Sequence, residues 1–250
     1  MIGSRQWMDL TQGKLNFKEK IKLINQVLIP TTLKYSRSFI QPRASSHSLQ
    51  FKHIQIPDTA LVQEAIHELS QCNHLAIIHH SWRSYFWGIG FAQIRKWHLD
   101  EESFIIACLM HDLGLVDHLE EYSCHCFTYE SALRAERLCE KHHYPEIKTK
   151  KISNAICLHM NGYVDAQDSN LSKEVVLLQQ ATSCDVIGTD YALFPSLFKN
   201  DVLLQYPRAH FNAEMSKLVL KEAKNRPQSR TALMCKLGLP QMIEMNIFKE

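Results

Sequence analysis

From Ile56 onward, apolar residues recur at a helical spacing almost without interruption. The 250 residues contain only eight glycines and eight prolines, too few for the many turns of a fold built from strands. The pattern predicts helices after Asp58 and over residues 74–97, 100–114, 128–143, 149–160, 172–186, 207–225 and 230–237. We therefore expect an all-α bundle.

The overall charge and the cysteines narrow the class of protein. Lysine and arginine exceed aspartate and glutamate by 28 to 26, a net charge of +2 that argues against a whole-protein nucleic-acid binder. No uncharged apolar run is long enough for a membrane span. Eight cysteines without a CxxC pair fit reduced thiols in a cytoplasmic protein. The sequence Cys124-His125-Cys126 resembles a metal clip, but a loop with two free thiols is the favoured interpretation.

The first 52 residues carry nine basic and only two acidic side chains. Such a segment could be an organelle transit sequence, an arm that faces an anion, or an extension packed on the main domain. We favour the extension, because a predicted helix over residues 17–29 has an apolar stripe that needs burial. The predicted organisation is a basic extension at 1–55 and a helical domain at 56–250, with its motifs within 56–188.

Polar side chains interrupt the apolar faces of three predicted helices. His80, His111 with Asp112, and Asp185 all fall where the spacing places buried residues. A buried charge is costly unless it is paired or bound to a metal. Two imidazoles and two carboxylates suit a divalent transition metal with an open position for water. The alternative is structural: a lone histidine is often a core residue, and a buried aspartate often pairs with arginine, here Arg83.

The order of these residues resembles the H…HD…D signature of the HD superfamily of metal-dependent hydrolases. Within it, the chain is similar to the cyanamide hydratase-like branch. The motifs that carry this resemblance are IPD at residues 56–58, HSWRSYFWG at 80–88, FTYESA at 127–132 and AICLH at 155–159. The chain departs from the branch at Thr128, where an acidic residue is usual, and at Ser131, where glycine is usual.

The resemblance implies a fold, a metal site and roles for individual residues. It implies an all-helical domain in which His80, His111, Asp112 and Asp185 bind one divalent metal, Zn²⁺ in the first instance and Fe²⁺ or Mn²⁺ as alternatives. Such a metal lowers the pKa of water towards neutrality. Asp112, His159 and Glu130 are the expected catalytic residues, with His159 and Glu130 as candidates for proton transfer or for orienting the metal ligands. Arg83, Tyr85 and Trp87 are expected to bind substrate.

Three functions remain open from the sequence. The first is hydration or hydrolysis of a small neutral molecule such as cyanamide, which predicts a compact pocket lined by Tyr85, Phe86 and Trp87 with few cations. The second is hydrolysis of a nucleotide or another phosphate ester, which needs several lysines or arginines at the phosphate. The third is an interaction module without catalysis. We expect a small-molecule substrate and no nucleic-acid or membrane partner; a homo-oligomer stays open.

Overall fold

The computed structural model describes residues 1–25, 29–38, 49–116 and 126–248, and these residues form helices and turns without a strand. The predicted all-α fold is confirmed. The α-helices are α1 (Arg5–Thr11), α2 (Phe17–Leu23), α3 (Ile29–Ser38), α4 (Ala60–Ser70), α5 (Leu75–Ile94), α6 (Glu101–Met110), α7 (Leu113–Val116), α8 (Phe127–Lys141), α9 (Glu146–Leu158), α10 (Lys173–Ile187), α11 (Ser196–Gln205), α12 (Phe211–Asn225), α13 (Arg230–Lys236) and α14 (Leu239–Glu244). Short 3-10 turns cover Phe51–His53, His159–Asn161 and Tyr191–Leu193.

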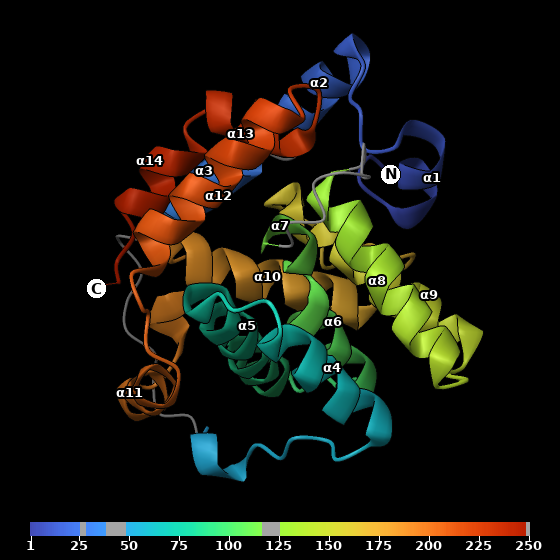
Figure 1. Cartoon of the computed structure of the whole chain (residues 1–250). Helices are drawn as coiled ribbons and strands as arrows, with labels where there is room; N and C mark the ends of the chain where they lie inside the picture. Colours follow the sequence, from blue (N-terminus) through green and yellow to red (C-terminus); the bar gives the residue numbers. More distant parts are fainter. Residues whose placement is uncertain (26–28, 39–48, 117–125, 249–250) are drawn as a thin grey trace.

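Helices α5, α6 and α10 form the centre of the molecule (Figure 1). Helix α5 packs along α10 and against α6, while α9 packs on α6 and α10 and pairs with α8. Helices α12, α13 and α14 contact one another and form a separate layer on one side. The central helices are therefore covered from two sides, which explains why they are apolar nearly all round.

Several helix ends fall where the sequence predicts them. Asp100 caps α6, its carboxylate accepting from the backbone N–H of Ser103 at 3.4 Å. Gly188 ends α10 in the left-handed conformation with φ 78°. The cap of α4 differs from the prediction by one residue: Thr59 accepts from the N–H of Val62 at 3.2 Å, so Thr59 caps this helix in place of Asp58.

Gly114 does not end a helix, contrary to the prediction. Helix α6 stops at Met110, and Gly114 lies inside the short helix α7. A Cβ atom at Gly114 would overlap the carbonyl oxygen of Phe127, at the start of α8. The glycine is needed for this close approach rather than for a cap. The approach places the segment after His111 directly against α8.

The N-terminal residues pack on the helical body. The Arg5 guanidinium pairs with Glu136 of α8 at 2.6 Å, and α1 contacts both α8 and α9. Trp7 and Met8 are buried in the main core. A domain boundary near residue 55 stays an interpretation.

The expectations about membrane spans and cysteines can be compared with the described part of the chain. Among the residues that the structure describes, no helix is both long and apolar enough to cross a membrane. The described cysteines are free thiols. Cys126 is buried at the start of α8, whereas Cys124 and His125 lie outside the described residues.

Candidate metal centre

Three buried side chains from two helices share one centre. His80 lies in the middle of α5, while His111 and Asp112 directly follow the last residue of α6. The Nε2 atoms of His80 and His111 are 3.1 Å apart. One carboxylate oxygen of Asp112 lies 3.5 Å from the Nε2 atom of His80 and 3.4 Å from that of His111. Possible ligand atoms of these residues lie within 4.8 Å of one another.

Hydrogen bonds at the far side of each ring fix the protonation of the two imidazoles. The Nδ1 atom of His111 lies 2.7 Å from the carbonyl oxygen of Cys108, and that of His80 lies 2.8 Å from a carboxylate oxygen of Asp185. Both oxygens only accept, so each Nδ1 carries a proton and donates it. When both rings are neutral, their Nε2 lone pairs face each other, so a proton or a metal ion has to lie between them. Two imidazoles and a carboxylate are a donor set that fits Zn²⁺ or Fe²⁺.

The electrostatics of the centre agree with this interpretation. Burial lowers the pKa of His80 to about 4, so this ring is neutral near pH 7. Burial also lowers the pKa of His111, but the neighbouring Asp112 carboxylate outweighs it and the pKa is raised. A metal ion at the Nε2 atom of His111 competes with a proton for the same lone pair. The pKa of Asp112 lies well below its usual range, because the nearby imidazoles outweigh the effect of burial.

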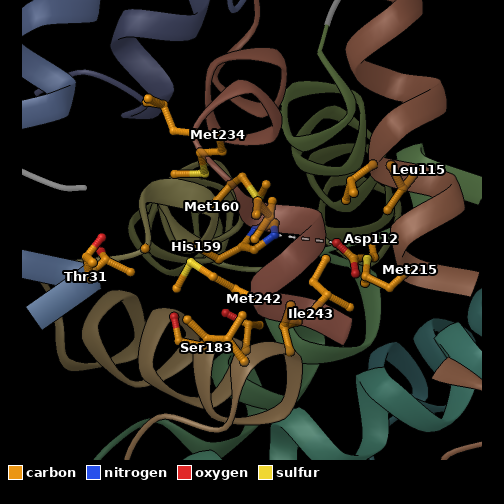
Figure 2. Close-up of a pocket in the computed structure, with 18 of the residues that line it drawn as sticks. Thr31, Asp112, Leu115, His159, Met160, Ser183, Met215, Met234, Met242 and Ile243 are labelled. Carbon is orange, nitrogen blue, oxygen red and sulfur yellow. Dashed lines mark ion pairs between the residues drawn. The ribbon is translucent and has the colours of Figure 1, made fainter. Parts of the chain in front are cut away.

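His159 completes the side of the centre that faces Asp112. It caps the C-terminal end of α9, and its Nδ1 atom donates to the carbonyl oxygen of Ile156 at 2.7 Å. His111 uses the same contact to the carbonyl three residues earlier, since the last carbonyls of a helix lack partners within it. The Nε2 atom of His159 is thereby free of its proton and lies 3.5 Å from an oxygen of Asp112, the pair joined by a dashed line in Figure 2.

The structure does not bring Asp185 into this group. Its carboxylate lies at the Nδ1 edge of His80, opposite the edge that faces His111. Arg83 donates to both carboxylate oxygens at 2.8 Å, Trp87 donates to one at 2.9 Å, and Arg208 lies 3.3 Å from the other. Burial raises the pKa of Asp185, but the two guanidinium groups outweigh it and hold the pKa well below its usual range. The carboxylate expected as a fourth ligand thus forms the ion pair with Arg83 that was the structural alternative.

The pocket at the centre is an apolar cavity of about 400 Å³. His80, Asp112 and His159 contribute to its wall, which is otherwise mostly aliphatic. The side chains of four methionines surround His159 and Asp112 in Figure 2: Met160, Met215, Met234 and Met242. None of the described lining residues is lysine or arginine.

The side chains that were expected to contact substrate do not line the described wall of this pocket. Tyr85, Phe86, Trp87 and Arg83 are absent from the described wall of this pocket. The hydroxyl of Tyr85 donates to the carbonyl oxygen of Gln55 at 3.0 Å. The indole N–H of Trp87 donates to the carboxylate of Asp185. These aromatic side chains therefore lie outside the described lining of this pocket, and their role in binding substrate stays a prediction.

Glu130 also lies away from the centre. It lines a second cavity, together with several basic residues of α8 and α12. Ser131, the next residue, accepts from the backbone N–H of Gly114 at 2.9 Å, so this part of α8 supports the chain after the HD dipeptide. The structure gives Glu130 no place among the metal-centre residues.

Arg208 and the methionines were not found from the sequence. Arg208 follows the resemblance by some twenty residues, and only the fold brings its guanidinium to Asp185. The methionines carry no spacing signal of their own. The available signal was the apolar stripe after Pro207, which predicts a buried face on α12 without indicating what that face encloses.

Comparison with known proteins assigns the class to which this site belongs. Residues 77–187 match the family model of the HD domain, and this segment contains His80, His111, Asp112 and Asp185. This segment of the chain is therefore similar to an HD domain. The chain is also similar to two cyanamide hydratases of Saccharomyces cerevisiae, DDI2 and DDI3. Each is 23% identical over 163 residues, which cover 62% of this chain and 69% of the relative. The chain is thus similar to proteins of the cyanamide hydratase-like branch.

Proposed function

We propose that this protein is a metal-dependent HD-domain enzyme that adds water to a small neutral molecule. One observation carries the proposal: two imidazole Nε2 atoms and a carboxylate converge beside an apolar pocket that His80 and Asp112 line, and the described lining of this pocket has no lysine or arginine. The relatives named cyanamide hydratases support a hydration reaction of this kind.

His80, His111 and Asp112 would hold the metal. A divalent cation bound there supplies Lewis acidity and lowers the pKa of water from about 15.7 towards 7. We assign Zn²⁺ first, with Fe²⁺ and Mn²⁺ as alternatives, because a site with two histidines and one carboxylate suits each of them. Three protein ligands leave open positions for water and substrate.

His159 is the proposed proton carrier. Its Nδ1–H is held by the carbonyl of Ile156, so its Nε2 atom can accept a proton and return it. It lines the pocket and lies 3.5 Å from Asp112, within reach of a molecule that touches both. Hydration of a nitrile adds oxygen to carbon and protons to nitrogen, and a neutral imidazole at this position can transfer such a proton.

Asp185 is proposed as a positioning residue. Its carboxylate accepts the Nδ1–H of His80 and thereby aims the Nε2 lone pair at the centre. Arg83 and Trp87 fix the carboxylate in turn. On this account Arg83 and Trp87 act through Asp185 and do not touch substrate.

Hydrolysis of a phosphate ester is the rival function. Phosphate recognition requires converging guanidinium or ammonium groups. The described wall of the pocket has no such cationic group, and the guanidinium of Arg83 donates its hydrogen bonds to the Asp185 carboxylate.

The test begins with protein purified without added metal. Its metal content is measured by mass spectrometry, and two assays follow: release of urea from cyanamide and release of phosphate from a panel of nucleotides. We expect about one metal ion per chain and formation of urea or of another hydration product. Phosphate release alone would replace the proposal with the rival function. Absence of bound metal and of both activities would support an interaction module.

A further inference from the structure

The pocket is far larger than a cyanamide-sized molecule needs. A water molecule takes up about 30 Å³ of the liquid, and cyanamide is only a few atoms in size. The cavity of about 400 Å³ falls in the range of pockets that bind much larger organic ligands. A molecule as small as cyanamide would leave most of this space empty and would be poorly oriented against His159.

Away from the metal centre, the polar side chains in the described wall of the cavity are the hydroxyls of Thr31, Thr32, Thr182 and Ser183. The hydroxyl of Thr182 donates to the carbonyl oxygen of Gln179, within α10. The hydroxyl of Ser183 accepts from the side chain of the same Gln179 at 2.7 Å. Most other described lining side chains are aliphatic or methionine. The chemistry of the wall therefore matches a hydrocarbon better than a polar or charged group.

Much of this wall comes from parts of the chain outside the matched segment 77–187. Met215 lies on α12, Met234 on α13, and Met242 on α14, while residues of α3 such as Thr31 line the same cavity. Figure 2 shows Met242 near His159, Met215 near Asp112 and Thr31 farther out. The matched segment supplies the reactive centre, and the flanking helices supply the enclosure.

Methionine side chains suit an enclosure of this kind. They are unbranched and polarizable, so they adapt to irregular apolar shapes. Met215 and Met234 are buried, and Met242 is partly exposed on the short helix α14. The wall can therefore close on an apolar body without polar complementarity.

We propose that the substrate has two parts: a neutral reactive group at His80, Asp112 and His159, and an apolar body of on the order of ten or more non-hydrogen atoms within the methionine-lined cavity. This inference rests on the proposed function for the identity of the reactive group. The size and apolarity of the body follow from the cavity.

The test measures binding apart from turnover. Straight-chain primary amides, the products expected from hydration of the corresponding nitriles, are titrated by calorimetry into the zinc-loaded protein. The chain is lengthened by one methylene at a time. We expect the affinity to rise about threefold to fourfold per methylene until the cavity is full, and then to level or fall. Affinity that does not change with chain length would overturn the proposal.

A matched pair of variants locates the binding. Met242→Trp places a larger ring in the cavity and is expected to weaken binding of a long amide at least tenfold, with the metal content unchanged. Met245→Trp, at the exposed end of α14 and outside the described lining, is the control and should bind as the unaltered protein does. Equal losses in both variants, or none in Met242→Trp, would place the apolar body elsewhere.

The two proposals fail in different ways. Length-dependent binding of amides without turnover of any nitrile would keep the cavity assignment and overturn the hydration reaction. Formation of urea from cyanamide with a flat amide series would keep the reaction and overturn the cavity assignment.

Discussion

Asp112 and Asp185 are buried carboxylates at opposite edges of the same imidazole, His80. Asp185 is neutralised by the guanidinium groups of Arg83 and Arg208. The basic groups that contact the Asp112 carboxylate, within the part of the chain that the structure describes, are all imidazoles. A buried carboxylate needs a cation, and only one of these two has a permanent one.

This difference in counter-charge separates a metal ligand from a positioning residue. The sequence pattern does not distinguish these two roles, because it predicts a metal ligand at both positions. The side of His80 that faces Asp112 opens into the cavity and can take a metal ion. The side that faces Asp185 is closed by protein donors and can only orient the ring. The predictions below test whether the two sides differ in this way.

The largest effect is expected at Asp112. Asp112→Asn removes the only carboxylate of the three-residue group, so we predict loss of bound metal and of activity together. Metal content by mass spectrometry, measured beside circular dichroism, tests this. The control is Asp201→Asn on α11, a partly exposed position that should keep its metal. A fully metallated Asp112→Asn protein would contradict the assignment.

At Asp185 we predict a loss of stability in place of a loss of metal. Asp185→Asn leaves the buried guanidinium of Arg83 without its counter-charge, which costs about 3–5 kcal/mol in the free energy of unfolding. Urea denaturation measures this cost, and metal analysis of the folded variant accompanies it. The ligand role that the family resemblance implies predicts the reverse, a stable protein from which the metal is lost.

His159→Ala tests the side of the centre that faces Asp112 and the cavity. Without the proposed proton carrier, turnover should fall about a hundredfold or more. The metal should remain, because His159 is not part of the three-residue group. The variant His67→Ala, exposed on α4, controls for the removal of any imidazole. Turnover equal to that of the unaltered protein would remove His159 from the mechanism.

The smallest effect is expected at Trp87. Trp87→Phe deletes one hydrogen bond to the ionised Asp185, and such bonds contribute about 1.5–3 kcal/mol. We predict a loss of stability in that range with metal content and substrate affinity unchanged. A marked fall in substrate affinity would restore Trp87 to the substrate site.

Helical spacing was sufficient to predict much of the site. Spacing placed His80 and His111 on buried faces and His159 was an expected catalytic residue, and the structure brings all three to Asp112. Short elements such as α1 and α14 were missed because a pattern of seven or six residues is too brief to stand out. The predicted length of α6 was also wrong, since Gly114 serves a close chain approach.

Roles that depend on distant partners could not be predicted from the sequence. Tyr85 lies about 140° around α5 from His80, so the two side chains point to opposite sides of the helix. Trp87 shares the face of His80 but lies two turns further along, where it meets Asp185. Whether Asp185 binds metal or arginine depends on Arg208, which reaches it from outside the motifs.

The most direct test of the assignment of His80, His111 and Asp112 as metal ligands is a crystal structure of the zinc-loaded protein with the metal located by anomalous scattering. We predict an ion about 2.0–2.2 Å from the Nε2 atoms of His80 and His111 and from an oxygen of Asp112, with Asp185 still against Arg83. An ion bound to the Asp185 carboxylate, or one located away from His80 and His111, would contradict it.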